Sequence, residues 1–261
     1  MEERSQTANK RSILDKVKTY SVYRSTIILL LIAVGLGLLT ISNPVAEIFS
    51  IAVCLVSSVI ADAAIFYTLN KKFRISENAI ITALIIGSIL SANAGIAILA
   101  LLNIIAIASK HFLKHEGFPI FNPAALAIVI AGLAFGFYGE WWASEERVFL
   151  IFAALLLAWK LNKFAMEIAF AGTWIAFHLA GIFLYEGTLT HSVLLVPAYF
   201  MAFMLLEPKT SPAKINRQII YGGFAALLAA ATFSFPLTVD NLALALLLAN
   251  LLNKAMSIAK I

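Results

Sequence analysis

Apolar residues run through this chain in long stretches that are separated by short polar joints. Such stretches are typical of helices that cross a membrane, whose hydrocarbon layer is about 30 Å thick. We interpret the pattern as an all-α integral membrane protein with about ten transmembrane helices. The predicted crossings span residues 25–41, 45–69, 78–90, 94–109, 122–137, 148–161, 164–185, 192–206, 218–235 and 241–256.

Charged residues sort between the two ends of these predicted helices. With the N-terminus inside, all of the 19 Lys and Arg residues except Arg147 fall in the N-terminal segment or in inner loops. The predicted outer loops instead carry acidic residues such as Glu47, Glu140 and Asp240. Inner loops of membrane proteins are enriched in Lys and Arg. The sorting therefore predicts a multi-pass membrane protein with both termini in the cytoplasm. We expect its membrane to be the plasma membrane of a prokaryote.

Composition supports a membrane protein and excludes several other classes. The chain is 62% hydrophobic and 13% charged, with a mean hydropathy of +0.93, far more apolar than a soluble domain. The net charge of +5 does not indicate a nucleic-acid partner, because the basic residues are spread over several inner loops. Cys54 is the single cysteine, which excludes an intrachain disulfide, and no metal-binding motif is present.

An odd number of crossings per half predicts an inverted repeat. After a polar N-terminal segment (1–24), residues 25–137 and 138–261 hold five predicted crossings each, so the second half enters from the opposite side. A weak echo supports this division: residues 118–127 and 235–245 both begin with Phe-Pro and lead through an Asn into an Ala/Leu-rich helix.

Both halves are predicted to break at their third crossing. Residues 78–90 give a helix of only about 20 Å at 1.5 Å per residue, and this helix ends in the turn from Ser91 to Gly95. Its counterpart, the eighth crossing, ends in the turn from Glu207 to Pro212. Polar backbone groups freed by a break are tolerated at membrane depth only against protein or a watery cavity. Paired breaks therefore predict a binding site.

Few polar residues within the crossings are candidates for chemistry. Asp62 is the strongest functional candidate among the carboxylates, because placing an ionisable group within a membrane costs free energy. Glu167 could instead reach the inner interface, and His178 is a lone histidine that more often serves as a hydrogen-bond donor between helices. The turn after Glu207 could present hydroxyls and a carboxylate to a ligand, or it could be an ordinary loop. Asn122 and Pro123 indicate a helix start.

Three stretches resemble one family of membrane flavin subunits. Residues 78–86 are similar to its third helix, and residues 110–124 are similar to its Lys, glycine loop and Asn-Pro-Ala helix entry. Residues 204–212 are similar to its Asp-Pro-Val-Thr-Ser-Pro turn, with Glu207 and Lys209 replacing the Asp and the Val. The family includes NqrB of the sodium-pumping NADH:quinone reductase and RnfD of the Rnf complex, and its fold is ten helices in two inverted repeats.

The resemblance implies a redox subunit of an ion-coupled electron transport complex, inactive alone, whose partners are other subunits or a soluble flavin or iron-sulfur reductase. It implies a flavin, either FMN or riboflavin. Covalent FMN is not expected, because the family's Ser-Gly-Ala-Thr attachment motif is absent. The candidate ion-coupling carboxylates are Asp62 and Glu207. The candidate flavin-binding residues are Thr82, Asn93, Lys110, Asn122, Pro123, Glu207, Thr210 and Ser211.

Two other functions fit the same pattern. Inverted five-helix repeats with paired broken helices are also the architecture of small-solute channels and transporters, including the urea-transporter-like fold. No ring of charge specifies a solute here. A purely structural membrane scaffold is the third alternative, and Asp62 together with the paired breaks argues against it.

Overall fold

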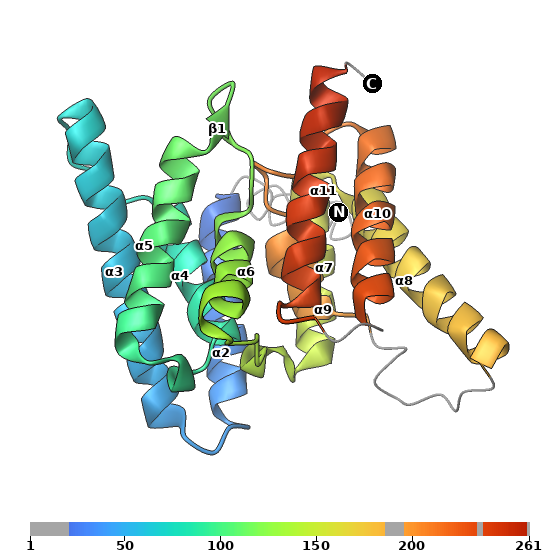
Figure 1. Ribbon diagram of the computed structural model, residues 1–261, viewed down its shortest axis with the longest axis horizontal. Helices are drawn as coiled ribbons and strands as arrows, with labels where there is room; N and C mark the ends of the chain where they lie inside the picture. The colour runs from blue at the N-terminus through green and yellow to red at the C-terminus, as the bar shows by residue number, and fades with distance from the viewer. Residues whose placement is uncertain (1–20, 186–195, 234–236, 260–261) are drawn as a thin grey trace, which may run out of the picture.

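The computed structural model describes residues 21–185, 196–233 and 237–259, and most of these residues are helical (Figure 1). The all-α prediction is confirmed, and each predicted crossing overlaps a helical segment. Most of the predicted N-terminal segment and the Phe-Pro of residues 235–236 lie outside the described residues. The helices are α2 (Val22–Leu38), α3 (Pro44–Asn70), α4 (Glu77–Ile89), α5 (Ile96–Phe112), α6 (Pro123–Phe135), α7 (Arg147–Leu161), α8 (Phe164–Tyr185), α9 (Ala198–Phe200), α10 (Ile215–Phe233) and α11 (Asn241–Ile258).

Four helices begin where a polar side chain accepts a hydrogen bond from the first turn. Asn43, Ser76, Asn122 and Asp240 each accept from the backbone N–H three residues further on, at 2.8–3.3 Å. Such caps satisfy backbone donors that a helix start leaves unpaired. Pro123 follows its cap at the first position of α6, where no backbone N–H is needed. The helix start predicted at Asn122 and Pro123 is therefore confirmed.

The predicted breaks are places where the chain leaves α-helical geometry. Helix α4 has 13 residues and ends at Ile89, and a short 3-10 turn, η1 (Ala92–Ala94), joins it to α5. In the second half, α9 continues as a π-helical turn, η3 (Met201–Leu205), and residues 206–214 are not helical. The remaining regular elements are a 3-10 turn, η2 (Trp142–Ser144), and a short hairpin between α5 and α6, in which β1 (Lys114–His115) pairs antiparallel with β2 (Phe118–Pro119).

The two halves lie side by side (Figure 1). In the first half α2 packs on α4, α3 on α5 and α5 on α6; in the second half α7 packs on α9 and η3, α8 on α10 and α10 on α11. The halves meet where α2 contacts α7 and where α6 contacts α11. By length and apolarity, α3 and α11 are the described helices that could cross a membrane, and five further apolar helical segments are shorter. Ten crossings and the inverted repeat stay predictions.

Basic residues contact one another's helices at one end of the bundle, and acidic residues of the predicted outer loops make contacts at the other end. At one end Arg24 of α2 pairs with Glu77 of α4 at 2.9 Å, and Lys160 of α7 donates to Ser25 at 2.8 Å. Contacts at the other end involve acidic residues: Glu47 accepts from the backbone N–H of residue 92 at 3.1 Å, and Asp240 accepts from the indole of Trp141 at 2.6 Å. We call the basic end the inner end, and its assignment to the cytoplasm stays a prediction.

One glycine allows α8 and α10 to touch. A Cβ built on Gly222 would lie 2.3 Å from the carbonyl oxygen of Met166, so Gly222→Ala must push the two backbones apart. We expect a loss of about 1–3 kcal/mol of stability, the usual cost of overpacking, measured as a lower unfolding midpoint in detergent. Gly172→Ala in α8 is the matched control, because nothing lies within 4 Å of its Cβ position. Equal midpoints for the two variants would contradict this close approach.

Candidate functional site

The turn after η3 is hydrogen-bonded within itself and held inside the bundle. Thr210 Oγ1 donates to Glu207 Oε2 at 3.0 Å, and Ser211 Oγ donates to the Glu207 carbonyl oxygen at 2.6 Å. Lys163, at the junction of α7 and α8, donates to the Ser211 hydroxyl, and Asn253 of α11 donates to the Thr210 carbonyl oxygen at 2.8 Å. Thr210 and Ser211 are buried. This turn is therefore not an exposed loop, and its two hydroxyls are already engaged.

Asn122 links this turn to the start of α6. Its side-chain oxygen caps α6 by accepting from the backbone N–H of Ala125, while Nδ2 donates to the Met204 carbonyl oxygen in η3 at 3.3 Å. The Asn122 backbone N–H donates to the side-chain oxygen of Asn250 at 2.8 Å, and Asn250 Nδ2 donates to the Tyr221 hydroxyl at 2.6 Å. A buried polar network thus connects α6, η3, α10 and α11.

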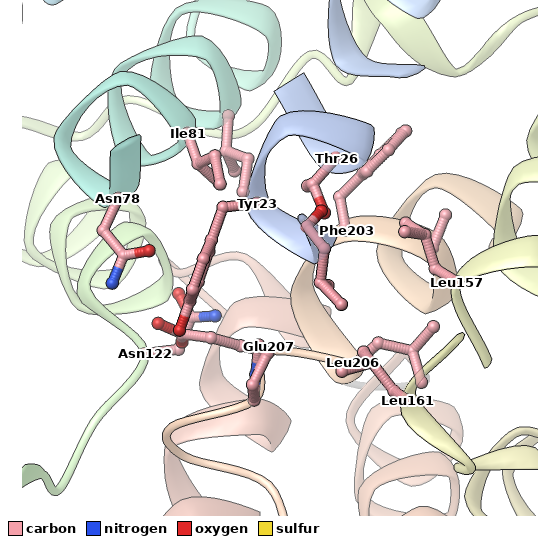
Figure 2. Close-up of a pocket in the computed structure, with 14 residues that line it drawn as sticks. Tyr23, Thr26, Asn78, Ile81, Asn122, Leu157, Leu161, Phe203, Leu206 and Glu207 are labelled. Atoms are coloured by element: carbon pink, nitrogen blue, oxygen red, sulfur yellow. The ribbon is translucent and has the colours of Figure 1, made fainter. Parts of the chain in front are cut away.

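A small cavity lies between α2, α4, α7 and η3. Figure 2 shows Tyr23, Asn78, Asn122 and Glu207 at its polar side. Its volume is about 40 Å³, enough for a few water molecules and too little for a tricyclic ring. The remaining wall is largely apolar and consists of Val22, Thr26, Ile81, Ile85, Leu157, Leu161, Ala202, Phe203, Leu206 and Pro208.

A larger cavity, which we call the inner cavity, opens at the inner end of α3, α4 and α5 beneath the β1–β2 hairpin. Its volume is about 600 Å³, within the range of small-molecule sites. Tyr23 and Asn78 line both cavities, so their side chains form part of the wall between them. The other lining residues are Asp62, Phe66, Arg74, Ile75, Ser76, Glu77, Lys110, His111, Lys114, Gly117, Phe118, Pro119 and Lys209.

Asp62 organises a buried charge cluster on the wall of the inner cavity. Its Oδ1 lies 3.1 Å from Lys110 Nζ and 2.9 Å from His111 Nε2. Lys110 also donates to the Ser76 hydroxyl at 3.1 Å. The Asp62 and Lys110 residues are 3% and 8% exposed, so each depends on the other for compensation of its charge. The three helices α3, α4 and α5 are thereby joined at the inner end.

Two ionisable groups near the turn are shifted by burial. Burial raises the pKa of the Glu207 carboxyl to about 7, while the Thr210 hydrogen bond and the nearby charges of Lys110, Lys209 and Lys163 oppose this rise. Burial also lowers the pKa of Lys163 to about 8, against the attraction of Glu207. Both groups therefore change charge close to neutral pH.

A comparison with known protein families tests the family resemblance of the three sequence stretches. The profile described as the NQR2, RnfD, RnfE family matches residues 7–145. The chain belongs to this family. The resemblance to NqrB and RnfD is therefore confirmed, and the chain is a membrane protein of the kind found in multi-subunit Rnf and Nqr complexes. A search of curated proteins found no match.

The matched segment includes the inner cavity's helices and ends before the Glu207 turn. Residues 7–145 contain α2 to α6 and the β1–β2 hairpin, so Asp62, Lys110 and Asn122 lie in the part of the chain that the NQR2, RnfD, RnfE profile recognises. Glu207 and its turn lie outside that match. The similarity of the turn to the family pattern rests on its own residues.

Most of the predicted site residues gather at the inner end, in two groups. Asn122, Glu207, Thr210 and Ser211 belong to the network around the turn and the small cavity, while Asp62 and Lys110 belong to the inner cavity. Thr82 is buried in α4, where its hydroxyl donates to the Asn78 carbonyl oxygen at 2.8 Å. Pro123 is buried at the first position of α6.

Asn93 is not brought together with the other predicted residues. It lies exposed in η1 at the opposite end of the bundle, where its Nδ2 donates to Glu140 Oε1 at 3.5 Å. The break at η1 thus contacts the loop before α7, whereas the break after η3 contacts the network around Asn122. A single site cannot hold both Asn93 and Glu207.

Sequence reasoning missed several residues of the inner cavity. The sequence analysis uses Arg74 and Lys114 only as charges that set the topology, and it names Lys209 only as a departure from the family's turn. It does not single out His111 or Tyr23. These residues come from separate segments, so only tertiary packing brings them together. The one signal available in the sequence was the recurrence of Lys and Arg in the inner loops beside the family-like stretches.

Two further polar residues of the crossings lie in α8. Glu167 is 4% exposed, and neither carboxylate oxygen has a hydrogen-bond partner among the described residues. His178 lies further along the helix, with its ring 4.7 Å from that of Trp174 in an edge-on arrangement. Neither residue lines the inner cavity or the small cavity. Cys54 is buried and unpaired, as an inert thiol would be.

The flavin implied by the family fits one of the two cavities. The small cavity is too narrow for the isoalloxazine ring, whereas the inner cavity has the volume of a cofactor site. Tyr23, Phe66 and Phe118 offer aromatic surface there, and Lys110 offers a positive charge anchored by Asp62.

Proposed function

We propose that this chain is a membrane subunit of an ion-coupled electron transport complex and that it holds a flavin non-covalently in the inner cavity. One observation carries the proposal: a 600 Å³ cavity at the basic end is lined by aromatic residues and by the buried Asp62–Lys110–His111 cluster. It lies in the part of the chain that the family profile matches. Partner subunits or a soluble reductase would approach at this end.

A bound flavin would supply reversible one- and two-electron chemistry. The chain's own residues would provide the electrostatic environment. Lys110, fixed by Asp62 and Ser76, holds a positive charge against the ligand without needing to reorganise. A fixed positive charge favours an anionic reduced ligand over a neutral oxidised one, so it raises the reduction potential. Tyr23 and Asn78 would separate the ligand from the small cavity.

The packing of the helices supports ten crossings in two inverted repeats. In each half the first segment packs on the third, the second on the fourth and the fourth on the fifth. The halves meet through equivalent elements, since α2 contacts α7 and α6 contacts α11. A two-fold relation between the halves would produce this pattern. An axis in the membrane plane would place the equivalent breaks at opposite ends, at η1 and after η3.

Asp62 and Glu207 remain the candidate ion-coupling carboxylates, and their surroundings differ. Asp62 is held by Lys110 and His111, so a cation would have to compete with both groups. Glu207 lines the small cavity and accepts a hydrogen bond from Thr210. Its pKa of about 7 would let it take up or release a proton as the charge nearby changes. Glu207 is the better candidate for a response to redox state.

The visible spectrum of the protein purified in mild detergent tests the flavin. We expect yellow absorbance that acid releases, together with an unmodified mass of the intact chain. Lys110→Gln should reduce the bound flavin severalfold, because it removes the charge facing the cavity, whereas Lys72→Gln in the same inner region should not. Lys72 is exposed and does not line the cavity.

Two other outcomes of this experiment would change the flavin proposal. A mass increase equal to that of FMN would replace the non-covalent proposal with covalent attachment. A colourless protein that takes up neither FMN nor riboflavin would overturn the flavin proposal and favour a small-solute channel or transporter.

A further inference from the structure

Helix α3 ends in a turn that carries aromatic and basic side chains. The residue after the helix, Lys71, has a left-handed backbone conformation at φ 55°, and its N–H donates to the Tyr67 carbonyl oxygen at 2.8 Å. A left-handed residue ends a helix and changes the direction of the chain. The Phe73 ring thereby returns to the Tyr67 ring, with 6.3 Å between their centres, and Lys71 Nζ lies 5.8 Å from the centre of the Tyr67 ring. We call residues 67–73 the α3 turn.

The lysines of the α3 turn have no acidic partner among the residues that the structure describes. Lys71 and Lys72 are exposed and form no salt bridge there, and residues 67–73 include neither Asp nor Glu. Tyr67 is 50% exposed and Phe73 is 79% exposed. Burying the two rings would be favourable, and an anion would relieve the repulsion between the lysines. The α3 turn therefore suits a partner that is apolar on one side and negatively charged on the other.

The length and the apolar surface of α3 place this turn where a membrane meets water. The helix has 27 residues and is about 40 Å long, about 10 Å more than the hydrocarbon layer. It lies at the edge of the first half and packs mainly on α4 and α5 (Figure 1). Val45, Phe49, Val56, Ile60 and Tyr67 are exposed along it, and spacings of four and seven residues put them on one face. The aromatic side of the turn thus continues a face that lipid tails would cover.

We propose that the α3 turn binds the headgroup of an anionic phospholipid. Lys71 and Lys72 would pair with the phosphate of the headgroup, each contributing roughly fivefold in affinity. Aromatic rings favour the boundary between headgroups and acyl chains, so Tyr67 and Phe73 would hold the lysines at the level of the phosphates. The inference does not rest on the flavin, because neither lysine lines the inner cavity.

Affinity for two lipids that differ only in the headgroup tests the site. The protein in mild detergent is titrated with phosphatidylglycerol and with phosphatidylcholine of the same acyl chains, and bound lipid is counted by native mass spectrometry. We expect phosphatidylglycerol to bind about tenfold more tightly. Lys71→Gln combined with Lys72→Gln should remove this preference and spare phosphatidylcholine binding. Phe73→Ser keeps both charges and should weaken the binding of both lipids severalfold.

Lys214→Gln combined with Lys254→Gln is the matched control, because it removes two cations from the same end of the bundle. Lys214 precedes α10, and Lys254 lies in α11, where it pairs with Glu116 at 3.6 Å. Neither lysine is next to an aromatic residue in the sequence. This control should keep the preference for phosphatidylglycerol. The unfolding midpoint without added lipid should not change in the α3 turn variants, because Lys71, Lys72 and Phe73 are exposed.

Three results would overturn the lipid site. The first is equal affinity for the two lipids, and the second is a preference for phosphatidylglycerol that the Lys71 and Lys72 variant weakens no more than the control does. Either of these would favour the competing interpretation, in which the α3 turn docks an acidic protein. The third is lipid binding that Phe73→Ser leaves unchanged, since attraction of counterions without a built site would then explain the preference.

Discussion

Replacing Asp62 with alanine is expected to destabilise the protein by about 3–5 kcal/mol, the cost of breaking a buried ion pair by removing one partner. Lys110, at 8% exposed, would keep its charge without a carboxylate, and His111 would lose its contact at 2.9 Å. The measurement is the shift of the unfolding midpoint in detergent, followed by circular dichroism. Flavin binding should be lost in parallel, because Asp62 positions Lys110 at the inner cavity.

Two further variants test whether the loss of stability comes from breaking the buried ion pair. Lys254→Gln removes an exposed pair, since the Glu116 side chain opposite is 74% exposed, and it should cost less than about 1 kcal/mol. Lys110→Met added to Asp62→Ala should recover part of the loss, because it removes the stranded charge. If Asp62→Ala lowered the unfolding midpoint as little as Lys254→Gln, the Asp62 cluster would not be the buried link between α3, α4 and α5.

The helices could be predicted because apolar stretches and turn chemistry are local signals. Asn122 and Pro123 start α6 as their types require, and residues 78–90 form the short α4. Helix ends were less accurate: α5 begins at Ile96 and ends at Phe112, shifted from the predicted 94–109. The shift has a physical cause, because η1 uses Ala92–Ala94 for a tight turn and Gly95 at φ 82° lies between that turn and α5.

The site was only partly predictable because its contacts join distant residues. Asp62 and Lys110 are 48 positions apart, and nothing local indicates that a lysine predicted to lie in an inner loop instead extends α5 and meets a carboxylate in α3. The sorting of charge placed Lys110, Arg74 and Lys209 at one end of the bundle, yet it could not distinguish lysines facing water from those lining a cavity. The π-helical turn η3 is also absent from the sequence pattern, since the apolar run through residues 201–205 suits any buried helix.

Glu207 is expected to make the protein less stable as the pH rises from about 5 to about 8. Its pKa is raised from 4.5 to about 7 in the folded protein. Below pH 4.5 both states hold the proton and the group has no effect. At higher pH the unfolded chain releases the proton first, so the folded state binds more protons and loses stability with rising pH. The full penalty, about 3 kcal/mol, is reached above pH 7.

Comparing the wild type with Glu207→Gln isolates this contribution. The glutamine variant keeps the side chain's shape and cannot ionise, so its unfolding midpoint should fall less between pH 5 and pH 8 than that of the wild type. Lys163, with a pKa of about 8, acts in the opposite sense, because its charged form is disfavoured by burial and stability rises as it loses its proton. That gain falls mainly above pH 8, so it does not hide the effect of Glu207 in the chosen window. Parallel profiles for the two proteins would mean that Glu207 does not take up a proton near neutral pH, which would also remove it as an ion-coupling candidate.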